Sequence, residues 1–145
     1  MNRYLLDTNI VSETIKPFPS ARLVNWLSNQ LDEELFISTV TLAEIQRGIF
    51  TLPKGKKRNE LNQWFSSVEG PASIFKGRIL SFDNASAKIW AQLMADGKKT
   101  GRPRNGFDML IAAIAYANDC LIITNNEKDF SGLKFFNPIK KSTEL

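Results

Sequence analysis

Short runs of apolar residues alternate along the chain with longer amphipathic segments. The runs have the length of buried strands, and the segments between them repeat apolar residues every three or four positions, as one face of a helix does. The pattern predicts strands at residues 4–6, 35–37, 79–82, 121–123 and 135–136, and helices at residues 8–15, 20–30, 39–50, 57–68, 84–96 and 108–118.

Strands that are apolar throughout and separated by helices are typical of a parallel sheet with both faces covered. We therefore predict an α/β protein with a three-layer α/β/α arrangement. No internal repeat, low-complexity tract or linker rich in Pro and Gly divides the sequence. Residues 1–145 are expected to form a single domain, the usual outcome for a chain of this length. Residues 97–106 are expected to form a basic loop.

Polar residues follow two of the predicted strands. Asp7 comes directly after the first strand, and Thr124 directly after the fourth. In parallel sheets of this kind, ligands bind beyond the carboxyl ends of the strands. Thr8, Asn9 and Asn126 are neighbours of these two residues along the chain and would lie at the same edge. The sequence therefore predicts a polar site at this edge of the sheet.

Four acidic residues could belong to this site, and each also has an ordinary structural explanation. Asp7 and Asp108 each stand where a helix begins, so either could simply cap its helix. Glu44 follows Thr41 with the spacing of a capping box, although the helical pattern starts before Thr41 and places Glu44 beside an apolar face. Asp129 lies in a polar stretch that is typical of a solvated turn. Taken singly, none of the four identifies a function.

Together, Asp7, Glu44 and Asp108 would gather several negative charges at one edge. Two carboxylates about 4 Å apart repel by roughly 4 kcal/mol at an effective dielectric constant near 20. A divalent cation relieves that repulsion, and it can also activate water and neutralise a phosphate. The chain has no His and one Cys, Cys120, which excludes the usual zinc ligand sets. A site built from oxygen ligands favours Mg²⁺ or Mn²⁺.

The formal net charge is +4, and many basic residues stand in groups. Such groups favour a polyanionic partner, because binding its phosphates releases counterions. Solvated surface loops would explain the same groups. The groups are Lys54, Lys56, Lys57 and Arg58; Lys98, Lys99, Arg102 and Arg104; and Lys140 with Lys141.

The sequence shows no feature of a membrane or secreted protein. It contains no run of about 18 apolar residues, so we expect no membrane span. The first apolar stretch is short and stops at Asp7, unlike a signal peptide. A single cysteine forms no internal disulfide. We therefore expect a cytoplasmic protein.

Five short motifs occur in a fixed order along the chain. They are LLDTNI at residues 5–10, STVTLAEI at residues 38–45 with Gly48 following, DMLIAA at residues 108–113, TNNEKDF at residues 124–130 and FNP at residues 136–138. In order and spacing, the sequence resembles the PIN-domain ribonucleases, in particular the VapC toxins and their FitB-like branch. The resemblance runs nearly from end to end.

This resemblance implies a PIN-like α/β/α sandwich with a parallel sheet, a homodimer and a small antitoxin protein as partner. It also implies that RNA is cleaved with Mg²⁺ or Mn²⁺, bound by Asp7, Glu44 and Asp108. The fourth acidic position of the FitB-like branch falls on Asn126. Other relatives have Asn there and an acid three residues later, where this chain has Asp129. Asn126 and Asp129 are therefore competing candidates.

The resulting hypothesis is an endoribonuclease, the toxin of a toxin–antitoxin pair, in which a metal-activated water attacks an RNA phosphodiester. The expected catalytic residues are Asp7, Glu44, Asp108 and Asp129. Thr8, Asn9, Thr124 and Asn126 are expected to hydrogen-bond the carboxylates or the scissile phosphate. Arg102, Arg104, Lys54, Lys56, Lys57 and Arg58 are expected to guide the RNA backbone.

Two other hypotheses stay open. A phosphotransfer protein, either receiver-like or a phosphatase with Asp7 as nucleophile, would also use acids at this edge, but Asn9 stands where such phosphatases have a second Asp. A catalytically silent PIN-fold module would use the fold only for binding. Large apolar residues in the N-terminal half could serve the core or contact a partner: Trp26, Trp64, Phe65 and Phe75.

Overall fold

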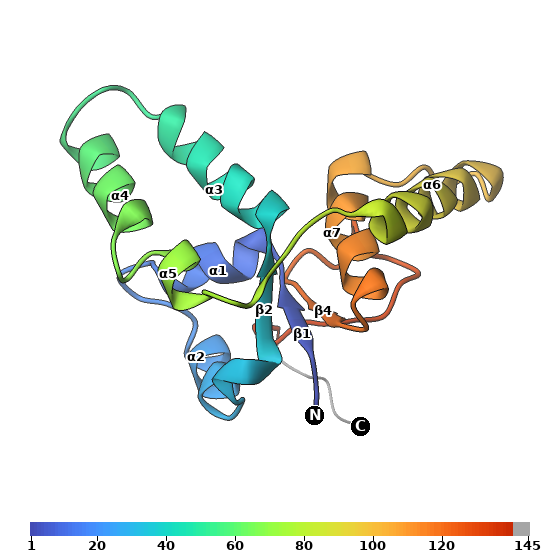
Figure 1. The fold of residues 1–145 in the computed structure, drawn as a ribbon, viewed down its shortest axis with the longest axis horizontal. Helices are drawn as coiled ribbons and strands as arrows, with labels where there is room; N and C mark the ends of the chain where they lie inside the picture. Colours follow the sequence, from blue (N-terminus) through green and yellow to red (C-terminus); the bar gives the residue numbers. More distant parts are fainter. Residues whose placement is uncertain (141–145) are drawn as a thin grey trace.

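Five parallel strands form the central sheet (Figure 1). The computed structural model describes residues 1–140; the last five positions of the predicted domain, Lys141 among them, lie outside the described residues. The predicted strands and their parallel pairing are confirmed, with the third strand shorter than expected. The strands are β1 (Tyr4–Leu6), β2 (Leu35–Ser38), β3 (Ile79–Leu80), β4 (Leu121–Ile123) and β5 (Phe135–Phe136), in the spatial order β3-β2-β1-β4-β5.

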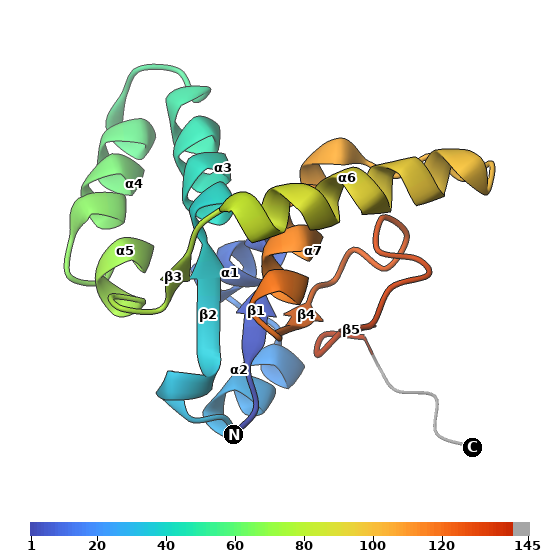
Figure 2. The same ribbon diagram turned by 45° about the vertical axis from the view of Figure 1, so that its right-hand side comes forward.

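Helices cover both faces of this sheet (Figure 2), which confirms the three-layer α/β/α arrangement. No helix within residues 1–140 is long and apolar enough to cross a membrane. The helices are α1 (Thr8–Thr14), α2 (Ala21–Ser28), the 3₁₀ helix η1 (Asp32–Glu34), α3 (Thr39–Phe50), α4 (Lys56–Ser66), α5 (Pro71–Ile74), α6 (Asn84–Lys99) and α7 (Gly106–Ala117).

The basic segment at residues 97–106 is helical at its start, contrary to the predicted loop. Helix α6 continues through Lys99, and Lys98 and Lys99 place positive charge at its negative end. The chain leaves the helix at Gly101, whose φ of 73° is a backbone conformation that glycine adopts without strain. The loop proper is therefore short and connects α6 directly to α7.

Alternating strand residues build two separate cores. Leu5 and Ile122 face α6 and α7, whereas Leu6 and Ile123 face α1, α2 and α3. This follows from the period of two along a strand, which sends successive side chains to opposite faces. The aromatic residues whose role the sequence left open are partly buried against the second core: Trp26, Trp64, Phe65 and Phe75.

Helix α7 is apolar almost all round because it lies between the sheet and α6. Its residues 111–115 are all buried. Two polar contacts fix the start of α7 against α6. Trp90 Nε1 donates to the Gly106 carbonyl at 2.9 Å, and Arg104 Nη1 donates to the Leu93 carbonyl at 2.7 Å. The first turn of α7, which carries Asp108, is therefore held in place.

The chain order of the sheet reverses at β1. Strands β2 and β3 lie on one side of it, and β4 and β5 on the other. In open α/β sheets such a reversal leaves a crevice at the carboxyl ends of the two strands concerned. Asp7 N donates to the Ile123 carbonyl at 2.9 Å, so β1 and β4 end side by side. This is the edge at which the sequence placed the polar residues.

Two glycine substitutions should have opposite effects on stability. A Cβ added at Gly70 would overlap the Phe65 carbonyl oxygen, whereas one added at Gly48 in α3 would meet no atom within 4 Å. We expect Gly70→Ala to lower the melting temperature. We expect Gly48→Ala to raise the free energy of unfolding by about 0.5–1 kcal/mol, because alanine favours a helix. Thermal unfolding of both variants checks this, and a stabilised Gly70→Ala would contradict the packing described.

Candidate active site

Asp7 is a buried carboxylate with three hydrogen-bond donors. Its side chain is only 3% exposed. It accepts from Thr8 N at 2.8 Å, from Asn9 Nδ2 at 3.0 Å and from Thr124 Oγ1 at 2.8 Å. Burial raises the pKa of Asp7 above its ordinary value, and these donors offset part of the rise. Asp7 does cap α1, as its position suggested, but the side-chain donors show a more elaborate environment than a cap requires.

The residues that surround Asp7 are bonded to one another. Thr124 Oγ1 accepts from Asn126 N at 2.9 Å and from Asn9 Nδ2 at 3.3 Å. Asn9 Oδ1 accepts from Asn125 N at 3.0 Å. The loop after β4 is thus tied to the first turn of α1, and both hold the Asp7 carboxylate in one orientation.

Glu44 reaches the same edge from α3. Its Oε1 accepts from Thr8 Oγ1 at 2.6 Å, and Thr8 Oγ1 also lies 3.0 Å from Thr41 Oγ1. Ser38 caps the helix, accepting from Thr41 N at 3.1 Å. Glu44 therefore lies beyond the first turn, and the capping-box explanation for Glu44 is wrong.

Asp108 lies in the first turn of α7 without capping it. The cap is Asn105, whose Oδ1 accepts from Phe107 N at 2.9 Å and from Asp108 N at 3.0 Å. Burial, the charge of Asp7 and a side-chain hydrogen bond with Asp129 raise the pKa of Asp108 to about 7. Sequence reasoning missed Asn105, although Asn three residues before an acid in a first turn is a common cap pattern.

Asn126 and Asp129 are bonded partners in the structure. Asn126 Nδ2 donates to Asp129 Oδ2 at 2.8 Å, and Asp129 N donates to Asn126 Oδ1 at 3.4 Å. Asp129 in turn shares the hydrogen bond with Asp108, which requires a proton on one of the two carboxyl groups. The two candidates for the fourth position therefore lie side by side, and the hydrogen bonds from and to Asn126 orient Asp129.

We call Asp7, Glu44, Asp108 and Asp129 the acid cluster. Their charges act on one another, since Glu44 raises the pKa of Asp7 and the other three raise that of Asp108. Every donor atom they offer is oxygen, which suits a hard divalent cation. Within residues 1–140 no three acidic or Cys side chains converge to hold an ion by themselves. An ion here would therefore take several ligands from water, as Mg²⁺ usually does.

The sequence pattern of one known family covers nearly all of the chain. The PIN domain matches residues 4–135. The chain belongs to the PIN-domain family.

Relatives of this PIN-domain chain align along almost their whole length. The toxin FitB of Neisseria gonorrhoeae is 36% identical over 92% of this chain and 96% of its own length. The VapC ribonuclease Y4jK of Sinorhizobium fredii is 34% identical over the same shares. The crystal structure of FitAcB from Neisseria gonorrhoeae superposes with a TM-score of 0.84, at 35% identity, over 93% of this chain and 97% of that one.

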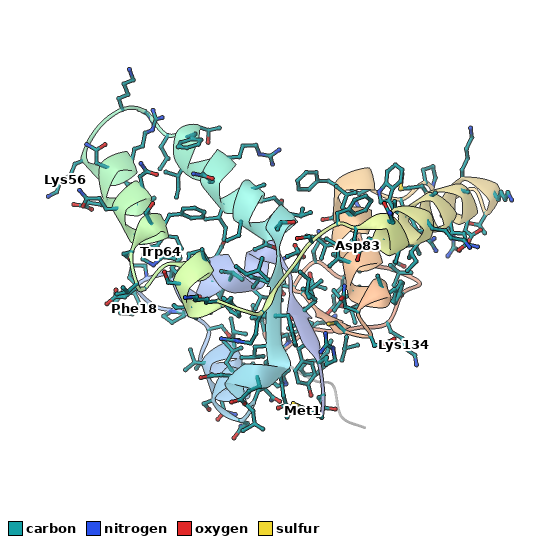
Figure 3. All side chains as sticks on the ribbon, in the orientation of Figure 1. Met1, Phe18, Lys56, Trp64, Asp83 and Lys134 are labelled. Atoms are coloured by element: carbon teal, nitrogen blue, oxygen red, sulfur yellow. The ribbon has the colours of Figure 1, made fainter. Side chains whose placement is uncertain are left out.

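The predicted RNA-guiding residues lie at two different distances from the acid cluster. Arg102 and Arg104 line a cavity of about 550 Å³ together with Lys128 and Asp129. Lys54, Lys56, Lys57 and Arg58 lie between α3 and α4 and in the first turn of α4, at the end of α3 that points away from the sheet (Figure 3, Lys56). The structure thus brings Arg102 and Arg104 beside the acid cluster, but not the group at Lys54–Arg58.

Two further residues, Arg47 and Phe107, lie next to acids of the cluster, and the sequence did not predict a role for them. Arg47 lies three residues after Glu44 on α3, and Phe107 immediately precedes Asp108 on α7. The Arg47 guanidinium lies 5.5 Å from the centroid of the Phe107 ring. Only the packing of α3 against α7 brings the two together, so no local sequence pattern indicates the pair.

The raised pKa of Asp108 predicts a pH-dependent loss of stability in the metal-free protein. Between about pH 4 and pH 7 the unfolded chain releases the Asp108 proton while the folded chain keeps it, so the free energy of unfolding falls as the pH rises through this window. Asp108→Asn cannot titrate and should escape the loss. Its melting temperature should therefore exceed that of the unsubstituted chain increasingly from pH 4 to pH 8.

Asp83→Asn is the matched control for this measurement. Hydrogen bonds from Ser86 lower the pKa of Asp83, so this carboxylate stabilises the folded chain above its ordinary pKa, the opposite sign. Asp83→Asn should therefore melt lower than the unsubstituted chain at neutral pH. A melting difference for Asp108→Asn that stays flat from pH 4 to pH 8 would contradict the charge coupling described for the acid cluster.

Proposed function

We propose that the protein is a metal-dependent endoribonuclease and the toxin of a toxin–antitoxin pair. The observation that carries the proposal is the acid cluster: four carboxylates from separate segments lie close enough at this edge of the sheet for their charges to interact, and the pKa of one, Asp108, is raised to about 7. Membership in the PIN-domain family and similarity to a protein named a ribonuclease support RNA as the substrate.

Asp7, Glu44 and Asp108 are the residues that would hold Mg²⁺ or Mn²⁺, directly or through water. When bound, such an ion lowers the pKa of water and offsets the charge that develops on a phosphate. Thr124, Asn9 and Thr8 keep the Asp7 carboxylate fixed and desolvated. A fixed carboxylate needs no reorganisation during the reaction, which is how a preorganised site lowers a barrier.

The Asp108–Asp129 pair supplies a place for a proton. Without an ion, Asp108 keeps a proton up to a pKa of about 7, because burial, the charge of Asp7 and the hydrogen bond with Asp129 disfavour its ionisation. A bound divalent ion would displace this proton, and the ionised carboxylates could then act as a base. We propose that the ionised pair accepts a proton from the attacking water.

Two features weigh against the alternative functions. A nucleophilic Asp of a phosphatase needs an exposed oxygen, whereas Asp7 is 3% exposed and its Oδ2 accepts two hydrogen bonds. A catalytically silent binding module would have no use for acids placed where their charges raise the pKa of Asp7 and Asp108. Metal-dependent cleavage explains why these acids are held together, because the cation needs them as ligands.

We also propose an antitoxin, a homodimer and a cytoplasmic location. FitB, which this chain resembles at 36% identity, is named a toxin. A toxin that degrades RNA in the cytoplasm must be held inactive by a partner until it is released. Two basic groups would attract RNA, because binding its phosphates releases counterions. One group, with Arg102, lies beside the acid cluster, and the other, with Lys56, lies further out.

Cleavage should depend on both the ion and the acids. We expect the purified chain to cut single-stranded RNA with Mg²⁺ or Mn²⁺ and to stop in excess EDTA. Asp7→Asn and Asp108→Asn should each reduce the rate at least about 100-fold, since each removes a charge that would hold the ion. Asp96→Asn, an exposed change on the outer half of α6, should cut normally. Undiminished cleavage in EDTA by the unsubstituted chain would refute the proposed mechanism.

The fourth position can be tested separately by Mn²⁺ titration. Asp129→Ala should weaken Mn²⁺ binding about 10- to 100-fold, as the loss of a supporting carboxylate does. Asn126→Asp should tighten it, because a second carboxylate beside Asp129 adds negative charge to the cluster. Asn125→Asp makes the same charge change at the exposed neighbouring position and should have a smaller effect. If Asp129→Ala bound Mn²⁺ like the unsubstituted chain, the site would contain only three working acids.

A further inference from the structure

Phe107 is an exposed aromatic ring beside the acid cluster. It lies in the first turn of α7, next to Asp108, and is 39% exposed. Further along the same helix, residues 111–115 are buried, whereas Phe107 belongs to neither of the two cores.

Arg47 supplies a positive charge at the same place. Its guanidinium lies 5.5 Å from the Phe107 ring centroid, and no carboxylate within residues 1–140 forms an ion pair with it. Arg47 and Glu44 are three residues apart on α3, so their side chains leave the same face of the helix. The pair thus spans the gap between α3 and α7, each member beside one acid of the cluster.

An aromatic face and a free guanidinium together match the two parts of a nucleotide. Every nucleobase has a π face that can stack on a phenylalanine ring, and a guanidinium binds the phosphate that follows. A base in a duplex is already stacked and paired, so only an unpaired base can use the ring. A purely apolar partner surface would use Phe107 but would leave Arg47 without a role.

We propose that Phe107 and Arg47 bind one unpaired nucleotide of single-stranded RNA next to the phosphate that is cleaved. The base stacks on the Phe107 ring, and the Arg47 guanidinium holds the adjoining phosphate. This inference rests on the proposed ribonuclease function and adds the two residues that hold a nucleotide beside the cleaved phosphate. Phe107 and Arg47 bind and position the RNA, and the acid cluster carries out the chemistry.

Binding without catalysis tests the proposal. The full chain in EDTA is titrated against a fluorescein-labelled single-stranded RNA of about 12 nucleotides and against an RNA duplex of the same length, with fluorescence anisotropy as the readout. Phe107→Ala should weaken single-strand binding about 5- to 100-fold and leave duplex binding unchanged. Phe107→Trp should bind the single strand at least as tightly as the unsubstituted chain, and Arg47→Ala should weaken both RNAs.

Phe50 provides the matched control. It is an exposed ring on the same helix α3 with an arginine, Arg58, at 5.7 Å from its centroid, but it lies at the end of α3 away from the acid cluster. Phe50→Ala should bind both RNAs like the unsubstituted chain. Equal losses in Phe107→Ala and Phe50→Ala, or equal losses for single-stranded and duplex RNA in Phe107→Ala, would overturn the proposal.

The outcomes separate this inference from the function on which it rests. If the unsubstituted chain binds RNA and Phe107→Ala binds the single strand equally well, only the stacking site is wrong. If the unsubstituted chain binds no RNA, the ribonuclease function fails and the stacking site with it. If Phe107→Ala fails to fold, Phe107→Trp still tests the proposal. This variant keeps an aromatic ring and must therefore retain single-strand binding.

Discussion

Mutual repulsion among four carboxylates is the constraint around which this protein is organised. Asp7, Glu44, Asp108 and Asp129 come from separate segments, and the charges of the other three all raise the pKa of Asp108. The protein lowers the cost in two ways. Donors from Thr8, Asn9 and Thr124 stabilise the charge on Asp7. The raised pKa of Asp108 lets a proton neutralise that carboxylate up to about pH 7, and a bound divalent cation would take the place of this proton.

The fold holds the carboxylates together despite that repulsion because each stands on a well-packed element. Asp7 ends the central strand β1, between two strands that hydrogen-bond to it. Asp108 starts α7, which the sheet and α6 cover on both sides. Because apolar burial contributes roughly 25 cal/mol per Å², packing of this extent outweighs a repulsion of a few kcal/mol. The two cores stabilise the fold, and the repulsion between the carboxylates at the sheet edge opposes that stability.

Most of the architecture could be predicted from the sequence, because continuous apolar runs and helical spacing reflect burial directly. Each predicted strand and long helix is present, and Asp7 and Thr124 end neighbouring strands as expected. The predictions that failed concern the ends of helices, which depend on caps and on contacts with neighbouring helices. The end of α6 depends on Gly101 and the charge of its last lysines, and Asn105 replaces Asp108 as the cap.

The finer features of the site could not be predicted because they join residues that are distant in sequence. Thr8 bonds to Glu44, 36 positions away, and Thr124 to Asp7, 117 positions away. The choice between Asn126 and Asp129 looked exclusive from a motif, yet the turn after β4 brings their side chains into contact. Arg47 and Phe107 show no local pattern at all. Hydrophobic periodicity reports burial, and it carries no information about such polar contacts.

The central claim is that the acid cluster holds a proton that a divalent cation displaces. It can be tested by calorimetric titration of the metal-free chain with Mn²⁺ in buffers of different ionisation enthalpy, which counts the protons released. With the Asp108 pKa at about 7, we predict release of about one proton per ion at pH 6 and almost none at pH 9. No binding of Mn²⁺, or binding at pH 6 without proton release, would contradict the account.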